Sequence, residues 1–232
     1  MAVLDGPRWE PQSGGRPQLI VLLLHGYGAD GNDLIDLAPH WAQAVPEALF
    51  LAPHAPLPCE AGPYGRQWFS LEDRSPARLL AGVQSARPQL DAFIAAECAA
   101  AGLPESAVVL MGFSQGAMMA LHTGLRRDPP PAAILAFSGR MIAEELLGAE
   151  LAGRPDVLLV HGEADEVVPV AASRSAEAVL LANGVPVQAL YVPRLGHGIE
   201  DAGLSLAGLA LQRAAARLEA AAASGDAAAG PA

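Results

Sequence analysis

The sequence predicts an α/β protein in which helices cover both faces of a mostly parallel sheet. Apolar runs of strand length alternate with stretches of helical apolar spacing six times along the 232 residues. That alternation is typical of βαβ units, which build parallel sheets. The runs are continuously apolar, as expected for strands buried on both faces. The length suits a single domain.

The six predicted strands are Leu19–Leu24, Leu49–Ala52, Ala107–Phe113, Ile134–Phe137, Val157–His161 and Val187–Val192. The predicted helices are Asp33–Val45, Pro76–Ala101, Gln115–Arg126, a short one near Glu144, Val170–Asn183 and Asp201–Ala223. Ser75 and Pro76 supply an N-cap and a first-turn proline for the second helix, and Gly102 supplies its C-terminal glycine. The stretch Pro53–Ser75 is predicted to be a long irregular loop, and such loops in compact domains are usually functional.

The domain is expected to span residues 16–223, after a polar N-terminal extension (1–15) and before a disordered tail (224–232). The N-terminus lacks the basic start and apolar stretch of a signal peptide. No apolar run approaches the ~18 residues that a membrane span needs. We therefore expect a soluble cytoplasmic protein without stable membrane insertion, with Cys59 and Cys98 reduced.

The charge balance excludes several classes of function. Fourteen basic residues against 25 acidic ones give a net charge of −11, which argues against binding to nucleic acids or anionic lipids. All fourteen are arginines, so lysine Schiff-base and P-loop chemistry are excluded. Two cysteines cannot form a four-cysteine metal site, and the six histidines show no ligand spacing. We expect neither a metal nor a cofactor.

A candidate nucleophile lies at the end of the third predicted strand. Gly112-Phe113-Ser114-Gln115-Gly116 matches G-x-S-x-G, between an apolar strand and a helix. In this sharp turn, bulk two residues to either side of the serine would clash, and glycine removes it. The alternative is an ordinary serine that caps a helix. The strand and helix on either side favour the nucleophile.

A serine hydroxyl needs a base and an acid, which in α/β-hydrolases follow it in the chain in the order acid, histidine. Asp165 follows the Val157–His161 strand and His197 follows the last strand. His197 would take the proton of Ser114, and Asp165 would hold the imidazole in the required tautomer. Glu163 and Glu166, which flank the aspartate, are expected to be exposed loop charges.

The other histidines are poorer candidates, because they end strands beside glycines (His25, His161), precede the serine (His40, His54) or lie two turns along its helix (His122). Two backbone N–H groups are also needed to bind the oxyanion. One should come from Gln115. The other should come from Tyr27, in the glycine-rich loop after the first strand, unless Tyr27 is only a packed aromatic.

Four segments together resemble the phospholipase/carboxylesterase family, which contains bacterial carboxylesterases and acyl-protein thioesterases. They are Leu24-His25-Gly26-Tyr27-Gly28-Ala29-Asp30, Gly112-Phe113-Ser114-Gln115-Gly116-Ala117, His161-Gly162-Glu163-Ala164-Asp165 with Val168-Pro169, and Gly196-His197. Gly65-Arg66-Gln67-Trp68-Phe69-Ser70 and Phe137-Ser138-Gly139-Arg140 are similar to a bacterial esterase branch. The similarity extends from about Leu19 to Arg217.

The resemblance implies an α/β-hydrolase fold without a large cap domain. It implies a carboxylesterase acting on small-molecule esters with short to medium acyl chains. The triad would be Ser114, Asp165 and His197, with oxyanion donors Tyr27 and Gln115. A homodimer is a candidate assembly, since related proteins are often dimers.

Several alternatives stay open. An acyl-protein thioesterase or lysophospholipase would use the same triad, and a non-catalytic binding protein could share the fold. Trp68 would line the acyl groove, and we expect Phe69 to join it, unless both are core residues of their loop. Arg140, after the Ile134–Phe137 strand, could hold a carboxylate or phosphate of the substrate, or pair with a local acid.

Overall fold

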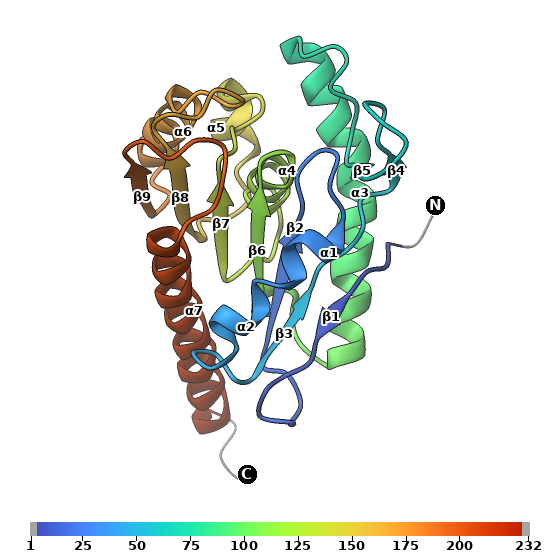
Figure 1. The fold of residues 1–232 in the computed structure, drawn as a ribbon. Coiled ribbons are helices and arrows are strands. Elements are labelled where there is room, and N and C mark those ends of the chain that lie inside the picture. The colour runs from blue at the N-terminus through green and yellow to red at the C-terminus, as the bar shows by residue number, and fades with distance from the viewer. Residues whose placement is uncertain (1–3, 229–232) are drawn as a thin grey trace.

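The computed structural model describes residues 4–228 and contains a seven-stranded sheet in the order β1–β3–β2–β6–β7–β8–β9 (Figure 1). Only the pairing of β1 with β3 is antiparallel. The predicted mostly parallel sheet is therefore confirmed. The strands are β1 (Arg8–Trp9), β2 (Leu19–Leu24), β3 (Ala48–Leu51), β6 (Val108–Phe113), β7 (Ala133–Phe137), β8 (Asp156–Gly162) and β9 (Val187–Val192).

Helices cover both faces of this sheet (Figure 1). One face carries α1 (Gly31–Ile35), α2 (Ala38–Ala42) and α7 (Asp201–Ala228). The other face carries α3 (Pro76–Ala101), α4 (Gln115–Gly124), α5 (Leu147–Glu150) and α6 (Ala171–Ala182). The 3₁₀ turns are η1 (Glu105–Ala107) and η2 (Glu144–Leu146). Every described helix of eight or more residues packs on the sheet, so none forms a separate cap domain.

The two cores divide each central strand residue by residue. In β2, Leu19, Val21 and Leu23 pack beneath α2 and α7. The intervening Ile20, Leu22 and Leu24 pack beneath α3 and α4. Successive side chains of a strand point to opposite faces of the sheet, and here helices bury both faces. This explains why the strand sequences are apolar without alternation.

The predicted helix Asp33–Val45 is instead two short helices, α1 and α2. Pro39 is the physical reason. Inside one continuous helix it would lack the N–H that bonds to the carbonyl of Ile35, and its ring would clash with that carbonyl. The chain therefore breaks at Asp36 and Leu37 and begins again with Pro39 in the first turn of α2, where no N–H is needed.

The ends of the chain also differ from expectation. The N-terminal extension contributes β1, which adds to the sheet edge through Arg8 opposite Leu51. Its two residues are both exposed, so no hydrophobic pattern marks it. Helix α7 continues to Ala228, so residues 224–228, which were predicted to belong to a disordered tail, are helical. Residues 229–232 lie outside the described part of the chain.

The loop 53–75 contains a small antiparallel ladder of β4 (Leu57–Pro58) and β5 (Arg66–Gln67). Gly102 ends α3 in the left-handed conformation (φ 70°), as predicted, whereas Ser75 caps α3 without a side-chain hydrogen bond. Both cysteines are free thiols. None of the helices within residues 4–228 has the length and apolar character needed to span a bilayer.

His122 in α4 gives a prediction about stability. The side chain is 1% exposed, and its Nδ1 has no hydrogen-bond partner among the described residues. Burial, with smaller contributions from Arg126 and Arg87, lowers the pKa of His122 to about 3. The histidine of the unfolded chain binds a proton near pH 6.5, whereas that of the folded chain does so only near pH 3. The free energy of unfolding is therefore unaffected by His122 above pH 6.5 and decreases as the pH falls from 6.5 toward 3. The slope is about 1.4 kcal/mol per pH unit for one proton.

We expect His122→Leu, which has no proton to bind, to remove that slope between pH 7 and pH 5. Urea unfolding at pH 5, 6 and 7 measures it. His25 is also buried, and desolvation lowers its pKa, but it titrates in both proteins, so their difference isolates His122. Equal slopes in the two proteins would contradict the assignment.

Candidate active site

The segments that carry the predicted site residues meet at the carboxyl edge of the sheet. Strands β2 and β6 are neighbours, with Leu24 opposite Gly112, and β8 and β9 are neighbours, with Gly162 opposite Val192. After β2 the chain moves to β3 on one side, whereas β6 lies on the other side. Ligands of open parallel sheets bind where the strand order reverses in this way.

The turn from β6 into α4 is a strained elbow. Ser114 has φ 54°, in the left-handed region that a residue with a side chain rarely adopts. A Cβ on Gly112 would lie less than 3.0 Å from the carbonyl oxygen of Gly116, and one on Gly116 equally close to that of Leu24. Only glycine fits at either position, which is the physical requirement predicted for this motif.

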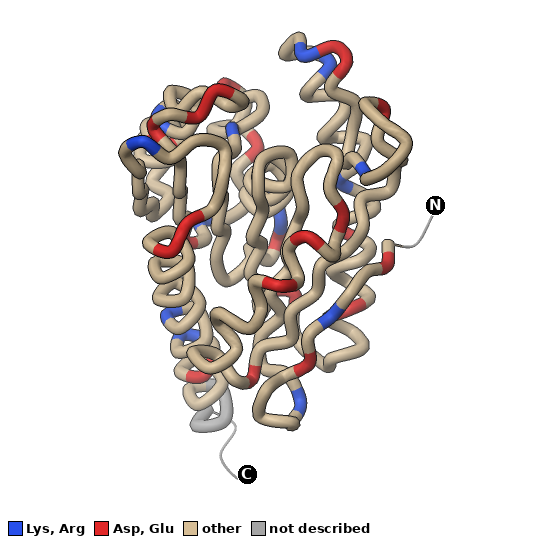
Figure 2. The backbone as a smooth tube through the Cα atoms, viewed as in Figure 1, with Lys and Arg blue, Asp and Glu red and all other residues tan. Residues whose placement is uncertain are grey.

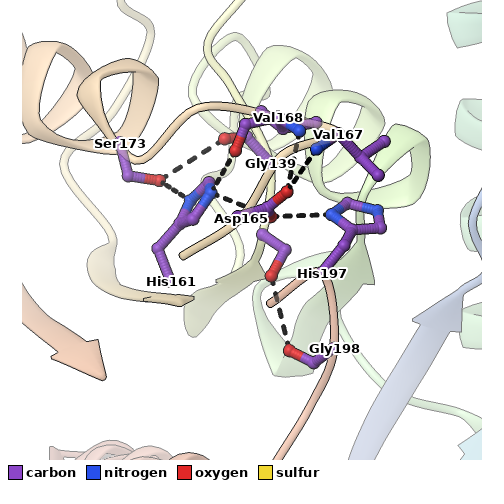
Figure 3. Close-up of polar contacts among 9 residues, drawn as sticks. Gly139, His161, Asp165, Val167, Val168, Ser173, His197 and Gly198 are labelled. Carbon is purple, nitrogen blue, oxygen red and sulfur yellow. Dashed lines mark hydrogen bonds and ion pairs between the residues drawn. The ribbon is translucent and has the colours of Figure 1, made fainter. Parts of the chain in front are cut away.

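Asp165 and His197 are brought together from the loops after β8 and β9 (Figure 3). Nδ1 of His197 lies 2.7 Å from Oδ2 of Asp165. Oδ1 of Asp165 accepts the backbone N–H groups of Val167 (2.8 Å) and Val168 (2.9 Å). Desolvation alone would raise the pKa of Asp165, but the bonds from His197 and these two N–H groups lower it below its usual value. The carboxylate is therefore held ionised.

A second histidine lies behind Asp165 (Figure 3). His161 is fully buried, with Nε2 3.2 Å from Oδ2 of Asp165 and 2.8 Å from the carbonyl oxygen of Val168. Its Nδ1 lies 2.6 Å from Oγ of Ser173. The sequence analysis set His161 aside as a poorer candidate for the base, because it ends a strand beside a glycine. The structure adds a contact between His161, near the end of β8, and the carboxylate in the loop that follows, and no sequence pattern predicted this contact.

His25 binds backbone with both ring nitrogens, to the carbonyl of Gly26 (2.7 Å) and the N–H of Ala55 (2.9 Å). The loop after β2 therefore has a fixed path. The backbone N–H of Tyr27 has no acceptor among the described residues, and Gln115, as the first residue of α4, has no intrahelical one. Both donors are thus free to bind an oxyanion.

The side chains of Gln115 and Glu60 hold the loop 53–75 in place through hydrogen bonds, a role that the sequence did not predict. Gln115 accepts the N–H of Trp68 at Oε1 (2.9 Å) and donates Nε2 to the carbonyl of Phe69 (2.7 Å). Glu60 accepts the hydroxyl of Tyr27 (3.1 Å) and the N–H of Leu71 (2.7 Å). Desolvation opposes ionisation of Glu60, but its hydrogen bonds hold the pKa at about 2.

A cavity of about 310 Å³ contains Ser114, His197, Tyr27 and Arg140 in its lining. Ser114 and His197 form no hydrogen bond in this structure; such pairs commonly tighten only with substrate bound. Apolar side chains line much of the remainder: Leu34, Leu71, Leu79, Phe113, Met118, Val167 and Val168. Among residues 4–228, no group of three or more His, Cys, Asp or Glu is arranged to hold a metal ion.

Trp68 and Phe69 do not line this cavity. They are 1% and 2% exposed and belong to the core beneath α3 and α4. Trp68 donates its indole N–H to the carbonyl of His25 (3.0 Å). The expectation that they form the acyl groove is corrected: both pack beneath their own loop, as the alternative proposed, and Leu71 takes a place in the lining.

Comparisons with known proteins decide the family. The model of the phospholipase/carboxylesterase family matches residues 11–210. The chain belongs to the phospholipase/carboxylesterase family. The crystal structure of esterase PE8 is 45% identical, covers 91% of this chain and 99% of its own, and superposes with a TM-score of 0.87. The α/β-hydrolase fold implied by the sequence is therefore confirmed.

Two curated relatives of this family member have different named activities. Esterase YpfH of Escherichia coli K12 is 29% identical over 84% of this chain and 83% of its own length. Acyl-protein thioesterase 1 of Neurospora crassa is 29% identical over 76% of this chain and 79% of its own. The family is thus one of hydrolytic esterases, and its members include thioesterases.

Proposed function

We propose that this chain is a serine carboxylesterase that hydrolyses short- to medium-chain acyl esters through an acyl-enzyme on Ser114. The observation that carries the proposal is the 2.7 Å contact between His197 and the buried Asp165, with His197 and Ser114 in one cavity. The esterase relatives and the family support the reaction class. The cavity of about 310 Å³ is at the small end of ligand sites, which favours small acyl groups.

In the proposed reaction, Oγ of Ser114 attacks the acyl carbonyl while Nε2 of His197 takes its proton. Asp165 keeps the proton of His197 on Nδ1, so Nε2 is free to accept. The N–H groups of Tyr27 and Gln115 bind the oxyanion. His197 then protonates the leaving alcohol, and a water deprotonated by His197 releases the acid.

An acyl-protein thioesterase or lysophospholipase is the second candidate, favoured by the match to the Neurospora thioesterase. The same triad would act on a thioester or a longer acyl chain. The two candidates differ in how the rate depends on chain length, because a small cavity penalises a long chain.

Rates on p-nitrophenyl esters of two to twelve carbons test both candidates. We expect fast turnover of short chains, and a loss of about 10⁴-fold or more in Ser114→Ala. A fluorophosphonate probe should label the wild type but not the variant. A rate that rises with chain length would favour the second candidate. Activity that survives in Ser114→Ala would overturn the nucleophile, and absence of labelling in folded wild type would favour a non-catalytic binding protein.

A further inference from the structure

Two arginines line the cavity that contains Ser114. The protein has a net charge of −11, and acidic positions are spread along its backbone (Figure 2). They are Arg140, after β7, and Arg74, before α3. Neither guanidinium lies within 4.0 Å of a carboxylate among the described residues. The local acid that could have neutralised Arg140 is therefore not in contact with it.

The fold places Arg140 at the cavity through a strained turn. Ser138 adopts φ 48°, and its N–H donates to the carbonyl of Val160 (2.8 Å). The next residue, Gly139, lies so close to α4 that a Cβ on it would be less than 3.0 Å from the Cβ of Ala117. The chain is thus held against the nucleophile helix just before Arg140, and Arg140 itself is exposed.

Arg74 is anchored by its own loop. Its Nε donates to the carbonyl of Leu71 (3.3 Å), and the N–H of Leu71 donates to Glu60 (2.7 Å). The two terminal nitrogens of Arg74 have no partner among the described residues. Arg78, four residues later, is different: it pairs with Asp73 at 3.7 Å and is not part of the cavity lining.

The carboxylates near these arginines form no ion pair with them. Among the described residues, Asp33 is the one carboxylate in the lining, and the ionised Asp165 lies 2.7 Å from the lining residue His197. The two arginines balance these two charges without contacting either carboxylate. Glu144 and Glu145 line an adjoining hollow that also contains Arg140. Glu144 is engaged by the hydroxyl of Ser175 (2.5 Å), and neither glutamate pairs with Arg140.

Arg140 stands where the two spaces meet. The adjoining hollow, of about 490 Å³, shares Leu79, Arg140 and Ala172 with the cavity. Ser114, Tyr27 and His197 belong to the first space alone. An anion at Arg140 would therefore sit at the boundary, apart from the N–H groups that are to bind the developing oxyanion.

We infer that Arg140, assisted by Arg74, binds an ionised carboxylate carried by the substrate, so that this cavity accepts half-esters of dicarboxylic acids. The inference rests on the proposed esterase function and narrows its substrate class. A guanidinium matches a carboxylate with two parallel hydrogen bonds. The competing reading is that Arg140 turns to Glu144 or Glu145 and contributes only to stability.

The test compares hydrolysis of monoethyl succinate, glutarate and adipate with that of neutral ethyl esters of the same chain lengths. A further arm uses 3-acetoxypropanoate, whose carboxylate is on the alcohol side. Wild type, Arg140→Gln, Arg74→Gln and Arg78→Gln are measured. We expect Arg140→Gln to lower kcat/KM for carboxylate-bearing esters by about tenfold or more, mainly through KM. Its kcat/KM for neutral esters should fall much less, so the ratio of kcat/KM between charged and neutral esters should change.

Arg74→Gln should act in the same direction with a smaller effect, and Arg78→Gln, which removes the same charge outside the cavity, should leave the ratio of the two substrates unchanged. If Arg140→Gln lowers kcat/KM for the half-esters, the bound carboxylate is on the acyl side of the substrate. If it lowers kcat/KM for 3-acetoxypropanoate, the bound carboxylate is on the alcohol side. An equal loss on charged and neutral esters, or no loss on either, would overturn the anion site. If only the anion site is wrong, the wild type still hydrolyses neutral esters. If the esterase proposal itself is wrong, the wild type hydrolyses none of these esters and Ser114 is not labelled by the fluorophosphonate probe.

Discussion

Replacing Asp165 by asparagine is expected to lower kcat/KM for a short p-nitrophenyl ester by about 10⁴-fold while the protein stays folded. In the wild type, Oδ1 accepts two backbone N–H groups and Oδ2 faces Nδ1 of His197. If asparagine keeps its oxygen on the backbone groups, its NH₂ faces His197 and must donate. The proton of His197 then moves to Nε2, which can no longer accept a proton from Ser114.

The opposite orientation of the asparagine amide is also unfavourable. The NH₂ would then face the N–H groups of Val167 and Val168, donor against donor, and two buried donors would lose their acceptor. Either orientation disables the base or strains the loop. The first is expected to prevail, because it keeps every backbone bond satisfied.

Rates on p-nitrophenyl acetate and butyrate, with thermal melts of both proteins, make the measurement. Glu163→Gln is the matched control: it removes a carboxylate two residues away that pairs with Arg174 (2.6 Å) on the surface. We expect its rate to stay within about twofold of the wild type. A large loss in the control and a small one in Asp165→Asn would mean that the acid is misassigned.

Much of this site could be predicted because a parallel sheet imposes its geometry. Residues that follow parallel strands of one sheet lie at the same edge, so placing Ser114, Asp165 and His197 after β6, β8 and β9 required only the strand ends. The glycines of the elbow were predictable for a similar reason. Their requirement is steric: Gly112 lies against Gly116 within five residues of chain, and Gly116 lies against Leu24 of the neighbouring strand β2.

The remainder depends on contacts between distant residues that no local pattern carries. An aromatic pair such as Trp68 and Phe69 has the same sequence whether it lines a cavity or fills a core. What decides is Gln115, whose side chain bonds to their backbone from 47 and 46 residues away. The proline break at Pro39 is the contrasting case, because its cause is local and was available from the sequence.

The steric requirement at the elbow predicts a second large effect, for Gly116→Ala. A Cβ at this position would overlap the carbonyl group of Leu24, the last residue of β2. Neither the backbone at Leu24 nor that at Gly116 can move without breaking hydrogen bonds. Leu24 is paired with Gly112 in the sheet, and Gly116 lies in the first turn of α4. We expect a loss of about 3 kcal/mol or more in the free energy of unfolding, or failure to fold.

The same change should also abolish esterase activity, because relief of the overlap must move α4 away from β2. That movement would separate the N–H of Gln115 from the loop that carries Tyr27, so the two oxyanion donors could not converge. Gly62→Ala is the matched control, since a Cβ there meets nothing within 4 Å, and its stability should change by less than about 0.5 kcal/mol. Urea unfolding and esterase rates of both variants make the comparison. A Gly116→Ala protein as stable and active as Gly62→Ala would refute the steric account, because the close approach of α4 to β2 would then not be required.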